Sequence, residues 1–237
     1  MKALGRLAVI LALGAVPGSV RAGGPVVVEL FTAQGCAPCK DANHLVARVA
    51  DRPGVIALTW PVDYWDYLGW KDTFAQPAYT LRQKAYAHRL GPRDVYTPQV
   101  VVNGAGQASG DDDAAVERLI DKSGHGHRRL PKIRWAAHGR LIIGRGVTPT
   151  HAAADVWLVR YDPREQDVTV TAGDNRGATV IQKNVVRQIV RLGAWTGRPG
   201  TFKLPPASEP GLGAAVIVQV ARGGVILAAA DAKARKS

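Results

Sequence analysis

Apolar runs and amphipathic stretches alternate through the first half of the chain. Four runs of strand-forming residues predict buried strands at 26–31, 55–62, 98–104 and 106–109. Apolar residues at helical spacing predict helices at 40–51, 74–91 and 114–122. The predicted order is therefore strand, helix, strand, a helical insert at 63–90, two strands and a final helix.

The pattern changes from Leu130 onward. Short alternating runs follow one another, and turn signals such as His138-Gly139 and Asp174-Asn175 separate them. This pattern predicts an all-β part, most simply a sandwich. The stretch 184–192 also fits a helical period, so strand and helix both stay open there. The expected organisation after the leader is a domain, a linker, a β-rich domain and a basic tail, at 23–124, 125–131, 132–232 and 233–237.

The first residues have the layout of a secretory signal peptide. Lys2 and Arg6 form a short positive region, and Leu7–Val16 is an apolar run too short to span a bilayer comfortably. Small or apolar residues precede a cut after Ala22, and a retained membrane anchor is the alternative. We expect removal of residues 1–22, a periplasmic or secreted protein, and no integral membrane segment after cleavage.

The charge balance is strongly basic, with 31 Lys and Arg against 19 Asp and Glu and a formal net charge of +12. Such a charge can attract anionic partners. The basic residues are nevertheless spread along the chain, and no nucleic-acid motif accompanies them. The sequence therefore predicts a solvated basic surface and no nucleic-acid partner.

The two cysteines of the chain, Cys36 and Cys39, form a Cys-Ala-Pro-Cys motif. A single pair of cysteines cannot supply a framework of several disulfides. The candidate roles of this pair are a redox couple, half of a metal site or a structural crosslink. A preceding strand and a following helix favour the redox couple, because a helix N-terminus stabilises the reactive thiolate. Cys36, expected at the open end of the turn, would attack, and Cys39 would resolve the mixed disulfide. The disulfide itself would be the redox group, with no other cofactor.

Residues 25–122 resemble the thioredoxin fold, with Tyr96-Thr97-Pro98 directly before the third strand. The resemblance implies that Pro98 is a cis proline beside the cysteines and part of the catalytic site. An ordinary proline at the start of a strand is the alternative. The resemblance also makes Thr97 a substrate contact, and Gly35 is a second substrate-binding candidate. The predicted fold is an α/β thioredoxin-like domain followed by an all-β, sandwich-like C-terminal domain.

Four long motifs resemble a narrower family, the secreted domain-of-unknown-function family 1223. They are VELFTAQGCAPCKDAN, VDYWDYLGWKDTFAQPAYTLRQKAYAHRLG, VYTPQVVVNG and GDNRGATVIQKNVVRQIVRLGAWTG. The resemblance spans nearly all of the chain after residue 22. It implies export and a thioredoxin-like fold, but no settled activity.

Glu29 is an acid inside the first apolar strand, seven residues before Cys36. Thioredoxins carry a buried acid one residue nearer their first cysteine, where it assists proton transfer to the resolving thiol. A shift of one residue reverses the face of a strand, so a longer turn would have to absorb it. Glu29 is therefore either a proton-transfer residue or a structural acid at the sheet edge.

The stretch Asp63–Asp72 combines several acids with large aromatic side chains directly after the second predicted strand. In the functional interpretation it forms a substrate wall, with Trp65 for contact and Asp63 or Asp66 for hydrogen bonds. In the structural interpretation the aromatics pack the helical insert on the sheet, and the acids cap turns. Both interpretations stay open.

Three functions compete at this stage. The leading hypothesis is an exported thiol–disulfide oxidoreductase that acts on protein or small-molecule thiols together with a redox partner protein. The alternatives are a Cu(I) metallochaperone, and a non-enzymatic adaptor whose disulfide staples the turn while the β domain binds a partner. An enzyme needs an accessible Cys36, a staple needs both sulfurs buried, and a chaperone needs a third ligand. The scattered histidines predict no other metal site.

Overall fold

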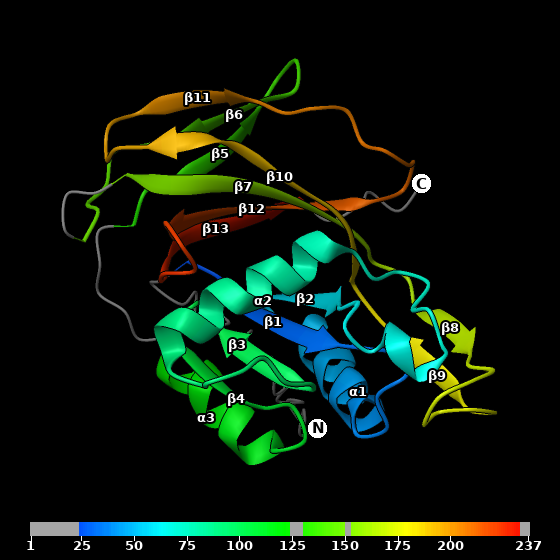
Figure 1. Cartoon of the computed structure of the whole chain (residues 1–237). Helices are drawn as coiled ribbons and strands as arrows, with labels where there is room; N and C mark the ends of the chain where they lie inside the picture. Colours follow the sequence, from blue (N-terminus) through cyan, green and yellow to red (C-terminus); the bar gives the residue numbers. More distant parts are fainter. Residues whose placement is uncertain (1–23, 124–129, 150–152, 233–237) are drawn as a thin grey trace, which may run out of the picture.

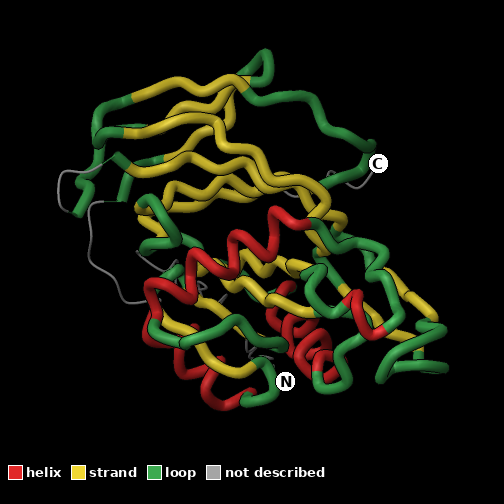
Figure 2. Tube along the Cα trace, in the orientation of Figure 1, coloured by secondary structure: helices red, strands yellow, loops and turns green. Residues whose placement is uncertain are grey.

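The computed structural model describes residues 24–123, 130–149 and 153–232 (Figure 1). The predicted signal peptide, the predicted basic tail and most of the predicted linker lie outside these residues. The described part is mainly sheet, with a few helices, as Figure 2 shows by colour. No helix in these three ranges is long and apolar enough to cross a membrane.

The helical elements are α1 (Cys39–Ala50), η1 (Asp66–Leu68), α2 (Pro77–Leu90) and α3 (Asp113–Ser123). The strands of the first half are β1 (Val26–Thr32), β2 (Val55–Pro61), β3 (Gln99–Val102) and β4 (Gly106–Ser109). Those of the second half are β5 (Ile133–Ala136), β6 (Arg140–Ile143), β7 (Ala154–Asp162), β8 (Gln166–Thr169), β9 (Thr179–Gln182), β10 (Val185–Trp195), β11 (Gly200–Lys203), β12 (Gly213–Val220) and β13 (Ile226–Ala232).

In the first half, β1 lies inside the sheet, parallel to β2 and antiparallel to β3, which pairs with β4. Alternate residues of β1 point to opposite faces. Val26, Val28 and Leu30 form a core with apolar residues of α1 and α3 on one face. The helix α1 supplies that core because its apolar residues recur at helical spacing and fall on one side. The other face of β1 carries Val27, Glu29 and Phe31.

One mixed sheet of eight strands runs through both halves of the chain, in the order β13-β12-β7-β10-β2-β1-β3-β4. Its halves are joined where Val185 aligns with Thr59. The Thr59 amide donates to the Asn184 carbonyl at 3.0 Å, and the Asn184 side-chain amide donates to the Ala57 carbonyl at 2.8 Å. The sheet is therefore continuous across the predicted domain boundary.

This continuous sheet makes the predicted fold wrong. The chain is not a thioredoxin-like domain followed by a separate all-β domain. The sequence pattern identifies which segments are strands, but periodicity holds no sign of which distant strands pair. The ambiguous stretch 184–192 lies almost entirely in β10. Pairing with β7 on one side and β2 on the other decides for a strand there.

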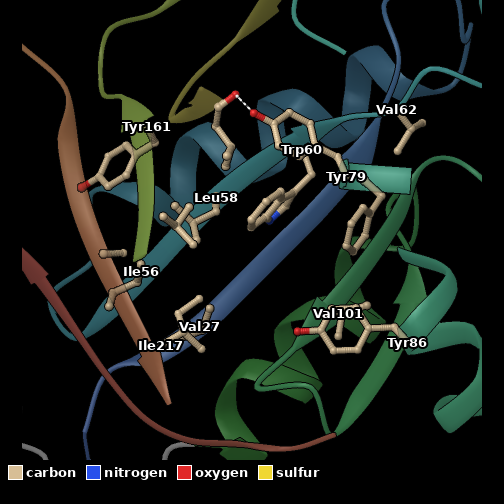
Figure 3. Close-up of a cluster of buried hydrophobic side chains, with 14 of the residues drawn as sticks. Val27, Ile56, Leu58, Trp60, Val62, Tyr79, Tyr86, Val101, Tyr161 and Ile217 are labelled. Carbon is tan, nitrogen blue, oxygen red and sulfur yellow. Dashed lines mark hydrogen bonds between the residues drawn. The ribbon is translucent and has the colours of Figure 1, made fainter. Parts of the chain in front are cut away.

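A central core unites the two halves of the sheet with α2, which lies between them in Figure 1. Phe31 of β1 and Trp60 of β2 stack with ring centroids 6.2 Å apart, and Tyr79 of α2 meets Trp60 edge-on at 5.3 Å. Tyr161 and Ile217 come to the same cluster from β7 and β12 (Figure 3). Both cysteines belong to this core.

The outer face of the second half is covered by the three-stranded sheet β11-β6-β5. Leu141 and Ile143 of β6 are fully buried there, together with Val156 of β7 and Val216 of β12. The short pair β8–β9 stands apart from both sheets and leads to the loop at 170–178. That loop bears on the candidate site.

Candidate functional site around the cysteine pair

Cys36 and Cys39 are joined by a disulfide, with their Cα atoms 5.4 Å apart. Cys39 is the first residue of α1, and no side chain caps that end of the helix. Both cysteines are 0 % exposed, whereas Ala37 and Pro38 between them are exposed. The bond therefore lies directly beneath a surface dipeptide. Cys36 was expected at an open position, and in this oxidised form it is closed off.

The Thr97–Pro98 peptide is cis, as the resemblance around Tyr96-Thr97-Pro98 implied. Pro98 lies against α1 through Gly110, because a Cβ added to Gly110 would be 2.8 Å from the Cβ atoms of both Pro98 and Ala42. Ala42 is one helical turn after Cys39 on α1. The structure thus brings Pro98 to the helix that begins at the cysteine pair.

Trp65 and Thr97 are also brought together, since the Trp65 indole N–H donates to the Thr97 hydroxyl at 2.7 Å. Trp65 packs against the core that contains both cysteines. Asp63 instead accepts a hydrogen bond from the Thr80 hydroxyl of α2 at 2.6 Å, which ties the insert down. Gly35 is buried, and a Cβ added to it would meet no atom within 4 Å. Substrate contact by these residues stays a prediction.

The loop at 170–178, which we call the cap loop, covers the cysteine turn. The Asn175 side-chain amide donates to the carbonyls of Gln34 and Cys36 at 2.8 and 2.9 Å, and Asn175 is buried. Gly173 has a φ of +73° and approaches Leu68 of the insert, where an added Cβ would lie 3.7 Å from the Leu68 carbonyl oxygen. A segment more than 130 residues away in sequence therefore clamps the turn that holds the disulfide.

Gln34 and Asp72 fix the same turn from the other side. Asp72 accepts the Gln34 amide at 2.7 Å and the amides of Phe74 and Ala75 at 2.9 and 3.2 Å. The Gln34 side-chain carbonyl accepts from the indole of Trp70 at 3.0 Å. Trp70 and Asp72 of the stretch at 63–72 therefore hold the cysteine turn in place. The structural interpretation expected acids that cap turns, and Asp72 also caps the amides of Phe74 and Ala75.

Asp72 should make the stability of the protein depend on pH. Burial raises the pKa of Asp72 to about 6, although the amides of Gln34, Phe74 and Ala75 oppose the rise. The pKa of Asp72 is higher in the folded state than in the unfolded state. Protonated Asp72 therefore contributes to the free energy of unfolding fully below about pH 4, and this contribution is lost as pH rises through 6. The stability of the wild type relative to Asp72→Asn should therefore fall by about 2 kcal/mol between pH 4 and 7. Urea unfolding of both proteins at four pH values measures this, and parallel curves would contradict it.

Glu29 is buried at 0 % exposure, and its partners come from α2. Arg82 donates to its two carboxylate oxygens at 2.7 and 3.1 Å, and the Tyr86 hydroxyl also donates to it. The expected position at a sheet edge is wrong, because β1 lies between β2 and β3. Its hydrogen-bond partners in the described ranges do not include a cysteine, so proton transfer stays an untested prediction.

A metal centre has little support in the described ranges, where no cluster of three or more His, Cys, Asp or Glu residues could hold an ion. The third ligand that a Cu(I) chaperone would need is therefore not found beside the cysteines in those ranges. His125 and His127 of the predicted linker lie outside them.

Sequence reasoning missed Asn175 and Arg82. The segment around Asn175 was interpreted as a simple turn, and only its presence in a family motif pointed to a role. Arg82 stands on an amphipathic helix with other charged residues, where a solvated position is the ordinary reading. Neither residue type has a sequence signal that reveals its partner in a distant segment.

The comparisons with known proteins agree on one relationship. The chain matches the family described as "Protein of unknown function (DUF1223)" over residues 27–219. It is similar to the crystal structure of a protein from Agrobacterium tumefaciens, with a TM-score of 0.73 and 32 % identity over 91 % of this chain and 97 % of that one. No curated protein matches. This chain belongs to the DUF1223 family.

Proposed function

We propose that the protein exchanges thiols and disulfides through Cys36 and Cys39. The observation that carries the proposal is a Cys-Ala-Pro-Cys disulfide at the start of α1, immediately under the exposed Ala37–Pro38. The sequence features of an exported protein, namely the predicted signal peptide and a periplasmic or secreted location, are consistent with disulfide chemistry. They remain part of the proposal.

The chemistry uses the pair alone. A substrate thiolate attacks the Cys36 sulfur, the Cys36–Cys39 bond breaks, and Cys39 leaves as a thiolate. A second substrate thiolate then attacks the substrate sulfur of the mixed disulfide, and Cys36 leaves as a thiolate. The substrate loses two electrons and the pair gains them, and the reverse sequence reduces a substrate disulfide. Amides of the first turn of α1 that no side chain caps stabilise the anion.

Access to the sulfur requires a local opening, since both cysteines are 0 % exposed. The cap loop is the segment to move, because Asn175 binds the carbonyl of Cys36 itself. Thr97, Pro98 and Trp65, close to the same core, would then border the path of the substrate. A redox partner protein that restores the pair after each turnover completes the cycle.

The test is a mixed-disulfide trap. The Cys39→Ser variant, mixed with a peptide that carries an activated disulfide, should hold the peptide on Cys36, visible by intact-mass spectrometry. The wild type should accelerate reduction of insulin disulfides by dithiothreitol, and Cys36→Ser should lower that rate about a hundredfold or more. The Cys36→Ser/Cys39→Ser double variant is the control. No adduct and no wild-type turnover would sink the proposal.

Full burial of both sulfurs favours a second function, a structural staple in a protein that acts by binding. In that case the double variant loses only the stability of a short closed loop, about 2 kcal/mol. Two measurements separate the functions. A staple predicts this loss in urea unfolding of the double variant and no insulin reduction by the wild type, whereas thiol–disulfide exchange predicts insulin reduction.

A further inference from the structure

A pocket of about 340 Å³ lies between α2 and the strands β7, β10 and β12, away from the cysteine turn. Its walls are mostly apolar, formed by Ala78, Ala85, Trp157, Ile189 and Val220. Leu81 of α2 stands at the pocket with 65 % of its surface exposed. This size and lining are those of small-molecule sites.

The buried polar side chains in this pocket are Arg82 and Gln219, which are 9 % and 2 % exposed, and Arg82 is the charged one. Its guanidinium donates to Glu29, to the Tyr86 hydroxyl and to the Gln219 side-chain carbonyl. These bonds occupy four of its five N–H groups. The remaining N–H, on Nη1, has no hydrogen-bond partner among the described residues. Because Glu29 balances the charge of Arg82, this N–H suits a neutral acceptor better than a second full anion.

The charged groups at the outer part of the pocket are Arg222 and Asp155. Asp155 is already paired with Arg191 at 2.7 Å. The Arg222 carbonyl accepts a hydrogen bond from Arg89 at 3.4 Å, which holds the turn against α2. The Arg222 side chain is exposed and makes no hydrogen bond or ion pair within the described ranges. The unbalanced charge of this pocket is therefore positive and lies at its outer part.

We propose that this α2 pocket binds an amphipathic monocarboxylate, with an aliphatic or aromatic body between α2 and the sheet and its carboxylate on Arg222. The apolar walls take the body and Trp157 offers a flat face to it. The carboxylate gains a charge-assisted hydrogen bond from Arg222. The net charge of +12 steers acids toward the protein in general. The proposal is independent of the cysteine chemistry.

The test uses decanoate as the probe, with decanol as its neutral match and decyltrimethylammonium as its cationic match. Binding to the wild-type chain is measured by isothermal titration calorimetry. Decanoate should bind about tenfold or more tightly than decanol, because only the acid gains the contact with Arg222. The cation should bind more weakly than either.

Two variants place the ligand in the pocket. Arg222→Asn removes the charge and tolerates the φ of +59° at this position, since Asn adopts that conformation readily. It should weaken decanoate about tenfold and leave decanol within about twofold. Arg93→Asn, the same change at an exposed arginine outside the pocket lining, is the matched control and should change neither. Ala85→Trp fills the pocket and should abolish binding of both, with Ala78→Trp as the replacement if that variant fails to fold.

Three results would each overturn the proposal. One is no heat of binding for decanoate at millimolar concentration. Another is equal weakening by Arg222→Asn and Arg93→Asn, which means general charge attraction. The third is full binding in the tryptophan variants, which places the acid elsewhere on the surface.

Discussion

Arg82→Leu should lower the free energy of unfolding by about 3–5 kcal/mol. The reason is that the substitution leaves the Glu29 carboxylate buried without its counter-charge. Glu29 is 0 % exposed, and its carboxylate accepts two bonds from the Arg82 guanidinium. Arg82 further links α2 to Gln219 of β12, so the cluster ties the first half of the sheet to the second. Urea unfolding at pH 7 measures the loss.

The matched control is Arg48→Leu, which breaks an exposed ion pair. Arg48 Nη2 and Asp113 Oδ2 lie 2.5 Å apart, but the two side chains are 55 and 57 % exposed. Such a pair contributes about 0–1 kcal/mol. The Glu29→Met/Arg82→Leu double variant should recover most of the loss, because no uncompensated charge then stays buried. Equal effects of Arg82→Leu and Arg48→Leu would contradict the prediction.

Asn175→Ala should raise the rate at which dithiothreitol reduces the Cys36–Cys39 disulfide by about 30-fold. A bond between two cysteines of 0 % exposure is reduced only after local opening. Asn175 closes the turn with two buried hydrogen bonds, each contributing about 0.5–1.5 kcal/mol. Losing about 2 kcal/mol multiplies the open population about 30-fold. Quenching with an alkylating reagent and mass analysis follows the reaction.

The control for this prediction is Asp174→Ala, at the exposed neighbour of Asn175 in the cap loop. It should leave the reduction rate within about twofold, because it removes neither clamp bond. If both variants are reduced at the wild-type rate, the reagent reaches the sulfurs by movement of residues 36–39 alone. The cap loop would then have no part in access.

The local elements were open to prediction because their signals are local. The helix α1 follows from its apolar spacing and from Pro38 at its start, and β1 from a run of β-branched residues. The two cysteines at the start of a helix pointed to the candidate site, and their disulfide is present. The cis peptide before Pro98 also agrees with the motif around it.

The burial of the disulfide could not be predicted from the sequence. The cap loop that closes it comes from the second half of the chain, and hydrogen bonds from Asn175 leave no periodic trace in the sequence. The partner of Glu29 was hidden for the same reason. An acid in an apolar strand predicts a counter-charge, but not that Arg82 of the helical insert supplies it.

By itself, the sequence determined the kinds of most elements, their approximate limits and the position of the cysteine pair, because helix and strand periods and turn residues act over a few neighbours. Only the tertiary structure decided that β10 docks on β2 and so merges the two expected domains into one sheet. It also decided that the disulfide is enclosed and that a pocket forms beside α2. These features depend on contacts between residues 70 or more positions apart, and the free energy of such contacts belongs to the pair rather than to either segment.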